Sequence, residues 1–239
     1  MARPGSDALK APNPHHATKE SEVPLSDFGA HDPEFTQKQK DACARIVDAV
    51  RALNTKVVRL SGSAEELNAA AERIEATTAS LGSITERRAI ETFHFDFDPD
   101  DPNRVMPFNP ATGRFNPVAP RVEMRLDGET LVGEFAFPSN YESGPDTVQG
   151  GMVAAFYDQL LAFAVMSRGR TGPTLWIRVS YLKRTPIEQP LRFEAEVVEI
   201  DQDHYTVRGA CFLGDTKVSE AEAAVLAKID MPLVGAPPK

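Results

Sequence analysis

Hydrophobic and polar residues alternate through much of the second half of the chain, and this period of two residues is typical of β-strands. Residues 121–126 alternate, Asp127-Gly128 is a turn signal, and residues 130–137 alternate again, so this stretch predicts a β-hairpin. Four later segments, separated by turn residues, also have strand character: 175–181, 191–200, 205–213 and 217–229.

One segment between these strands has a different pattern. Residues 151–166 are apolar nearly all round, which predicts a fully buried helix. The predicted order is therefore β-β-α-β-β-β-β. A single buried helix followed by a run of strands favours an α+β architecture, in which an antiparallel sheet wraps around the helix.

The first third of the chain has helical periodicity instead. Asp32-Pro33 predicts a helix start, with Asp as the N-cap, and apolar residues recur at helical spacing up to position 60. Ser61-Gly62-Ser63 interrupts the pattern, and Ser63 with Glu66 has the spacing of a capping box, which predicts a second helix. We expect a helical hairpin or a bent arm, serving in packing or dimerisation.

The sequence predicts five segments along the chain. Residues 1–31 are rich in Pro, Ser, His and charge, which is typical of a disordered tail, whereas the Pro, Asn and Asp residues after position 90 predict a connecting loop. The expected divisions are a disordered tail at 1–31, a helical arm at 32–84, a connecting loop at 85–115, the α+β domain at 116–232 and a short tail at 233–239.

Charge and composition exclude several classes of function. The formal net charge is -9, and residues 34–75 hold seven Lys/Arg and seven Asp/Glu, so the arm is neutral and we expect no nucleic-acid partner. The longest apolar stretch, 152–166, is shorter than the ~20 residues of a membrane span, and the N-terminus lacks the apolar core of a secretory signal, so we expect no membrane insertion. Two distant cysteines exclude a disulfide scaffold and a cysteine zinc cluster, and they fit a reducing cytoplasm, the expected location.

The chemistry of the predicted helix centres on Asp158. Gly150 and Gly151 stand at the helix entry, where free N–H groups favour negative charge and glycine lets a ligand approach the backbone. Asp158 follows Gly151 by seven residues, about two turns along the same face, and its neighbours there are small alanines. An ionised Asp is costly to bury without a partner, so Asp158 is either a functional carboxylate or a structural residue that caps a neighbouring backbone or faces solvent.

The same stretch resembles the hotdog-fold thioesterase superfamily, specifically its phenylacetyl-CoA and 4-hydroxybenzoyl-CoA thioesterase-like group. That group has a Gly-Pro loop, a His-Gly-Gly sequence, an acid on the central helix and a Gly-x-Thr at the next strand. The matching positions are Ser143-Gly144-Pro145, Gln149-Gly150-Gly151, Asp158, Gly172-Pro173-Thr174, the strand end at 181–186 and the lead-in at 115–120. The resemblance covers about half of the chain and implies a hotdog fold with an N-terminal helical extension.

Gln149 departs from the family pattern, because it stands where the family has His. Gln is neutral and cannot shuttle protons, but its amide N–H can still donate to a carbonyl or hold a loop. Asp158 is therefore the one titratable group in the motif.

The resemblance implies hydrolysis of an acyl-CoA thioester, with Asp158 as general base or as nucleophile. The N–H of Gly151, together with Gln149, would polarise the carbonyl, and Thr174 would orient the water or the carboxylate. In the family this Thr often comes from the partner subunit, so we expect a homodimer or homotetramer. The expected substrate-binding residues are Gly150, Met152, Asn140, Arg178, Lys183 and Arg184, the last three for the CoA phosphates. Neither a metal nor a cofactor is expected, since CoA is part of the substrate.

Three other functions remain open from the sequence. The domain could bind acyl-CoA without hydrolysing it, as a regulator. It could be a hotdog dehydratase or hydratase, although that chemistry commonly needs His and no His lies between His94 and His204. It could also be a scaffold whose arm drives oligomerisation, which would leave Asp158 unexplained.

Overall fold

The structure, a computed structural model, describes residues 36–84, 86, 94 and 96–235. The arm consists of two helices, α1 (Gln37–Val57) and α2 (Ala64–Ser80), and α2 runs into a 3-10 turn, η2 (Leu81–Ser83). The predicted start of the first helix was wrong, because Thr36 is the N-cap and forms a capping box with Gln39. Asp32 and Pro33 lie outside the described residues. The capping box of Ser63 and Glu66 is confirmed.

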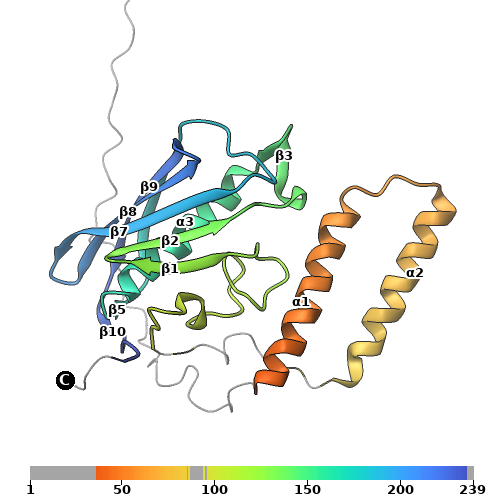
Figure 1. The fold of residues 1–239 in the computed structure, drawn as a ribbon, viewed down its shortest axis with the longest axis horizontal. Coiled ribbons are helices and arrows are strands. Elements are labelled where there is room, and N and C mark those ends of the chain that lie inside the picture. The colour runs from red at the N-terminus through yellow and green to blue at the C-terminus, as the bar shows by residue number, and fades with distance from the viewer. Residues whose placement is uncertain (1–35, 85, 87–93, 95, 236–239) are drawn as a thin grey trace, which may run out of the picture.

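The two helices of the arm differ in how they meet the rest of the chain. α1 buries Val47 and lies against the domain, whereas α2 buries no side chain and is further from the sheet (Figure 1). No described helix has the length and apolar character that a membrane span requires. Between the arm and the sheet, residues 96–122 form turns with one 3-10 turn, η4 (Pro102–Arg104), as the density of Pro, Asn and Asp predicts.

The predicted hairpin is confirmed as β1 (Glu123–Asp127) paired with β2 (Thr130–Phe135). Its turn needs Gly128, which has a φ of 60°, in the left-handed region that glycine adopts at little cost. These strands begin an antiparallel six-stranded sheet with the order β1-β2-β7-β8-β9-β6. The other four strands are β6 (Thr174–Tyr181), β7 (Leu191–Asp201), β8 (His204–Leu213) and β9 (Thr216–Leu226).

The helix α3 (Gly150–Met166) packs against the inner face of this sheet. Its Phe156 contacts Phe135 and Phe193, with ring centroids 4.5 and 4.6 Å apart. Tyr157 is fully buried, and its hydroxyl shares a hydrogen bond of 2.9 Å with the Ser219 hydroxyl on β9. A sheet wrapped around one central helix, with helices added at the N-terminus, is the hotdog fold with an N-terminal extension, so the predicted fold class is confirmed.

Several short elements escaped sequence analysis because they hold too few residues to show a period. A 3-10 turn and two short strands lead into α3, and two further strands pair beside its end. They are η5 (Ser139–Tyr141), β3 (Glu142–Gly144), β4 (Thr147–Val148), β5 (Arg170–Thr171) and β10 (Ile229–Asp230). The predicted strand at 217–229 is therefore interrupted after Leu226.

Burial on β8 makes the fold sensitive to alkaline pH. Burial raises the pKa of the Cys211 thiol from 9.0 to about 12, so the folded chain keeps this proton at pH values where the unfolded chain loses it. The free energy of unfolding is therefore expected to fall as pH rises above 9, with a slope of up to ~1.4 kcal/mol per pH unit. Urea titrations at several pH values between 8 and 10 measure this slope.

The matched control is Cys211→Ala, which removes the titrating group. Its free energy of unfolding should be lower overall but should change less between pH 8 and 10, and the change that remains comes from the tyrosines whose pKa burial raises from the ordinary 10.0. Equal slopes in the two proteins would contradict the assignment to Cys211.

Candidate active site

The entry to α3 is built from the Gln149-Gly150-Gly151 motif. Gln149 is the N-cap, and its side-chain oxygen accepts a hydrogen bond of 2.9 Å from the N–H of Met152. A Cβ on Gly151 would lie 2.8 Å from that oxygen, so glycine at 151 leaves room for the capping amide. The N–H of Gly151 lies in the first turn, where helical N–H groups have no intrahelical acceptor and favour a developing negative charge.

Tyr181 holds this entry from the end of β6. Its hydroxyl donates a hydrogen bond of 2.6 Å to the carbonyl oxygen of Gly150, and burial raises the pKa of the phenol. A Cβ on Gly150 would approach the Tyr181 ring to 3.3 Å, which explains the first glycine of the pair. In the sequence, Tyr181 was noted only as part of the resemblance at 181–186. Its contact with the glycines could be recognised only in the folded structure.

The segment after β6 also lies beside the entry. The N–H of Val148 donates to the carbonyl oxygen of Thr185 at 2.9 Å, and Thr147 bridges to Pro186. Lys183 and Arg184 lie on this segment, and both are exposed. Their position beside the entry to α3 agrees with the expected phosphate-binding role, which stays a prediction.

Asp158 lies on the side of α3 that the sheet does not cover. Gly151, Ala155 and Asp158 are exposed, and Ala154 is half-buried on the same side. No described residue forms an ion pair or hydrogen bond with the Asp158 carboxylate. The expectation of a helix buried all round was therefore wrong for the single chain: α3 is buried only on its sheet side.

One border of this uncovered helix face is formed by the loop before the sheet. The amide of Asn109 donates to the side-chain oxygen of Gln159 at 2.5 Å, and the Asn109 oxygen accepts from the N–H of Ala111 and Thr112. Gln159 is the neighbour of Asp158 on α3. The loop therefore limits the space beside the carboxylate from one side. This role of Asn109 could not be recognised in the sequence.

Thr174 lies at the other end of the helix from the glycines. It begins β6, shortly after the C-terminal end of α3, whereas Tyr181 at the end of β6 contacts Gly150. Thr174 and Gly151 of one chain are thus separated by about the length of α3, ~25 Å for this helix. Gly172 before it is explained by packing, because a Cβ there would lie 1.7 Å from the carbonyl oxygen of Leu226.

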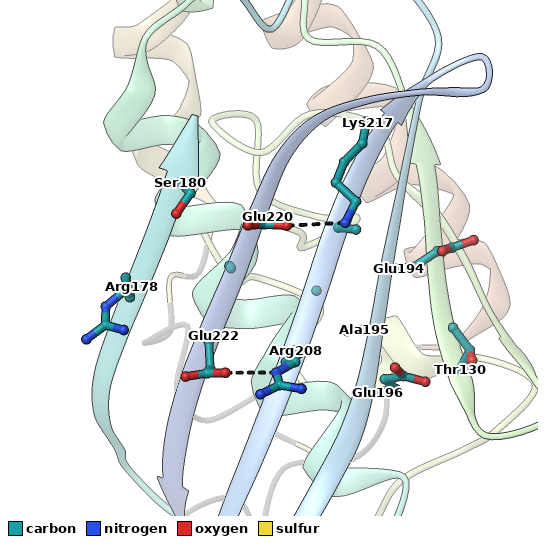
Figure 2. A pocket seen from close by; sticks show the side chains of 13 residues that line it. Thr130, Arg178, Ser180, Glu194, Ala195, Glu196, Arg208, Lys217, Glu220 and Glu222 are labelled. Carbon is teal, nitrogen blue, oxygen red and sulfur yellow. Dashed lines mark hydrogen bonds and ion pairs between the residues drawn. The ribbon is translucent and has the colours of Figure 1, made fainter. Parts of the chain in front are cut away.

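Arg178, an expected binding residue, lies on the outer face of the sheet, away from α3 of its own chain. It lies with Trp176 on the outer face, and the two groups are 5.8 Å apart, whereas Ile177 packs into the core on the α3 side. The alternation of side chains along a strand places the sheet between Arg178 and Asp158. Arg178 is one of the residues that line a cavity of about 500 Å³ on this outer face. The same face carries the ion pair of Arg208 and Glu222 (Figure 2).

Asn140, another expected binding residue, lies in η5 beside the arm. The Thr55 hydroxyl of α1 donates to its side-chain oxygen at 3.4 Å. Asn140 is half-buried and connects to the α3 entry through its neighbour Tyr141, whose carbonyl oxygen accepts from the N–H of Gln149 at 2.8 Å. The structure therefore places Asn140 between the arm and the entry.

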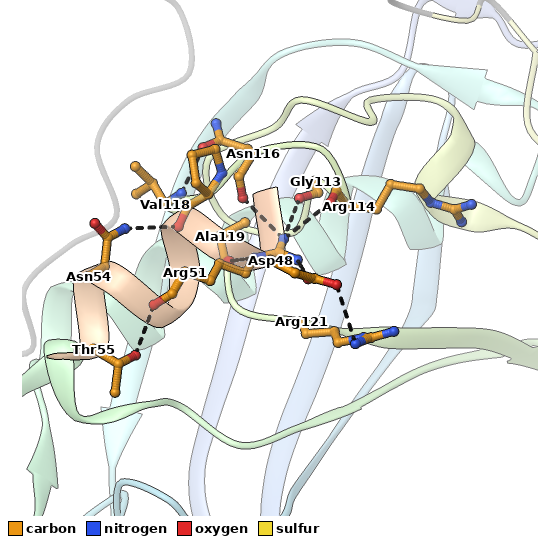
Figure 3. A network of polar contacts seen from close by, with 11 residues as sticks. Asp48, Arg51, Asn54, Thr55, Gly113, Arg114, Asn116, Val118, Ala119 and Arg121 are labelled. Atoms are coloured by element: carbon orange, nitrogen blue, oxygen red, sulfur yellow. Dashed lines mark hydrogen bonds and ion pairs between the residues drawn. The ribbon is translucent and has the colours of Figure 1, made fainter. Parts of the chain in front are cut away.

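The arm is held in this position by Arg51 of α1. Its guanidinium donates to four backbone carbonyl oxygens of the loop before the sheet, at 3.0 to 3.3 Å (Figure 3). The acceptors are those of Gly113, Arg114, Asn116 and Ala119. Only 17% of the Arg51 side chain is exposed, so these hydrogen bonds are largely shielded from water.

We therefore expect Arg51→Met to loosen the arm. The change keeps the apolar stem but leaves part-buried carbonyl oxygens without a donor, which should lower the free energy of unfolding by about 2–3 kcal/mol. Chemical denaturation and amide hydrogen exchange in α1 measure the effect. The matched control is Arg45→Met on the exposed side of α1; equal exchange in both variants would contradict the role of Arg51.

Among the described residues, no group of three or more His, Cys, Asp or Glu side chains is placed to hold a metal ion.

Comparison with known proteins gives the fold a precedent. The sequence matches no protein-family model and no curated protein. A solved structure described as a thioesterase superfamily protein is 21% identical and has a TM-score of 0.67; the match covers 83% of this chain and 94% of that one. Because it spans more than the half of the chain that forms the sheet and α3, this similarity extends into the residues before them.

Two smaller solved proteins match only part of the chain. A hypothetical thioesterase from Streptococcus pneumoniae TIGR4, solved with coenzyme A, is 18% identical with a TM-score of 0.44, over 46% of this chain and 88% of that one. Zebra fish thioesterase superfamily member 2 is 17% identical with a TM-score of 0.41, over 44% of this chain and 80% of that one.

Proposed function

We propose that the protein is an acyl-CoA thioesterase that works as a homodimer, with Asp158 as its catalytic carboxylate. The observation that carries the proposal is the unpaired carboxylate of Asp158 among small residues on the face of α3 that begins at Gly151. Such a face offers a base, space for a substrate and helix N–H donors. The name of the structural neighbour with the TM-score of 0.67 agrees with this chemistry.

One chain does not contain a complete site. Gly151 and Asp158 are seven residues apart, which is ~10.5 Å along an α-helix. The oxyanion donor and the base must both lie within about 3 Å of groups on the same thioester or its attacking water. We propose that a second copy supplies one of the two groups, because this rise separates them widely within a single chain.

A two-fold axis at the middle of the uncovered face would complete the site. Ala154 and Ala155 lie midway between Gly151 and Asp158, and their small side chains permit close approach of two helices. Two antiparallel copies of α3 that cross there bring Gly151 of one chain beside Asp158 of the other. The free edge of the sheet at β6 is available for pairing with its counterpart in the same dimer.

In the proposed reaction, the N–H of Gly151 donates to the thioester carbonyl oxygen as it gains negative charge. The Gln149 amide nitrogen is a second candidate donor, since its oxygen is used in capping. Asp158 accepts a proton from water while the water oxygen attacks the carbonyl carbon. The C–S bond then breaks, and the CoA thiolate takes up a proton, giving free acid and CoA.

Attack by Asp158 itself, through a mixed anhydride that water then hydrolyses, is the other course that the residues allow. A single turnover in ¹⁸O-labelled water identifies the anhydride course when water attacks the Asp158 carbon of the anhydride. The label then enters the Asp158 carboxylate, and the product acid carries an unlabelled oxygen from the enzyme, whereas direct attack by water places the label in the product. Thr174 remains a predicted orienting hydroxyl in either course.

Release of free thiol from a panel of acyl-CoA thioesters tests the proposal. We expect turnover by purified protein with at least one acyl chain. Saturable binding of acyl-CoA without thiol release would show instead a non-catalytic acyl-CoA-binding protein.

A further inference from the structure

A cleft between α1 and the domain has the chemistry of an anion site. It has a volume of about 580 Å³, and its lining includes four cationic side chains and no carboxylate. The cations are Arg51, Lys56, Arg59 and Arg121. This concentration of positive charge contrasts with the formal net charge of -9 of the whole chain.

The cations of this cleft are not equally available to a ligand. The Arg51 guanidinium is occupied by backbone carbonyl oxygens, and Arg59 pairs with Glu188. Arg121 is 80% exposed and has only a distant carboxylate oxygen of Asp48, at 3.8 Å. Lys56 and Arg121 are thus the groups best able to bind an incoming anion.

The rest of the cleft wall is largely apolar, with Thr55 and Asn140 as its uncharged polar members. Pro117, Pro120 and Pro138 line it together with Tyr141, whose ring is almost fully buried. Flat, apolar surfaces of this kind suit a purine ring, and the volume is within the ~300–1,000 Å³ range of ligand sites. A cationic rim over such a wall favours a phosphorylated nucleotide over a simple anion.

A second hollow adjoins the cleft and extends towards the entry of α3. This hollow, of about 520 Å³, shares Arg59 and Asn140 with the cleft and continues along Ser143 and Gly144 of β3. The next strand, β4, leads directly into Gln149 and α3. A long ligand could therefore extend from the arm towards the glycines at the α3 entry.

We propose that the cleft between α1 and the domain binds the 3′-phosphorylated ADP end of CoA, with Lys56 and Arg121 contacting its phosphates. The proposal rests on the proposed thioesterase function for the identity of the ligand. It gives the arm a function in substrate binding. The acyl chain of the same ligand would lie at the uncovered face of α3.

Adenosine 3′,5′-bisphosphate is the probe for binding, and calorimetry measures its affinity without any need for catalysis. The double variant Lys56→Gln/Arg121→Gln should bind it at least about ten-fold more weakly, since charged hydrogen bonds are lost. Arg45→Gln, which removes one charge from the exposed side of α1, should bind like the wild type. The wild-type affinity should fall with added salt.

Kinetics then identify the source of the nucleotide. The double variant should raise KM for acyl-CoA about ten-fold with kcat within two-fold of the wild type. It should act like the wild type on the same acyl group carried by N-acetylcysteamine, which lacks the nucleotide.

Three results would overturn the proposal: no bisphosphate binding by the wild type, equal binding by the double variant, or weaker bisphosphate binding without a change in acyl-CoA kinetics. The last result would indicate a separate nucleotide site. If the wild type hydrolyses no thioester, the thioesterase proposal fails, while competition of acyl-CoA with the bisphosphate in calorimetry still decides whether CoA occupies the cleft.

Discussion

Asp158→Asn is expected to lower kcat/KM for acyl-CoA by about 100- to 10,000-fold, the usual contribution of a positioned general base. The amide has nearly the same shape as the carboxylate but cannot accept the proton of the attacking water, and it is a poor nucleophile. Because the Asp158 carboxylate is exposed and unpaired in the single chain, the free energy of unfolding should change by less than about 0.5 kcal/mol.

The matched control for this substitution is Asp215→Asn. Asp215 is exposed in the turn between β8 and β9, so the change removes the same charge in the same shape at a distance from α3. It should leave both activity and stability at the wild-type level. Turnover by Asp158→Asn at more than half the wild-type rate would remove Asp158 from the mechanism.

The second expected result concerns sharing of the site between two chains. Gly151→Pro removes the N–H proposed to stabilise the oxyanion, and its Cβ also displaces the Gln149 side chain, the second candidate donor. Pro is tolerated in the first helical turn, and the loss of these donors should lower kcat/KM by about 100- to 1,000-fold. A heterodimer of an Asp158→Asn chain with a Gly151→Pro chain has one site in which both groups are intact. Its activity should return to about half that of the wild-type dimer.

The control heterodimer carries both substitutions in one chain and pairs it with a wild-type chain. If Gly151 and Asp158 act across the dimer, each of its two sites lacks one group, and activity should be nearly absent. If both groups act within a chain, the outcomes are reversed, and the second heterodimer keeps about half the activity. Two affinity tags allow each heterodimer to be isolated, and thiol release measures its turnover.

The local pattern of the sequence predicts most of the fold. The Asp127-Gly128 turn, the four later strands and the central helix could be recognised because each depends on the residues of its own segment. The capping box of Ser63 and Glu66 is local in the same sense. The predicted helix start at Asp32-Pro33 failed because Thr36 and Gln39 provide a competing cap nearer to the apolar residues of α1.

The candidate site was less predictable from the sequence. The glycines and Asp158 could be chosen, since helix geometry places them on one side of α3. The exposure of Asp158 could not be predicted. A helix that is apolar nearly all round is expected to be buried on every side, even when the residues on one side are small. The position of Arg178 on the outer face could not be predicted either, because spacing along a strand does not say which face of the sheet meets the helix.

The sequence by itself determined the order of the main strands along the chain, the central helix and the carboxylate on it, because hydrophobic periodicity and helix caps act over a few residues. Only the tertiary structure decided that Tyr181 holds the glycine entry, that Arg51 binds α1 to the loop before the sheet, and that Arg178 lies on the outer face. These contacts join residues that lie far apart in the chain. Such residues are brought together by packing of the whole core, which no single segment determines.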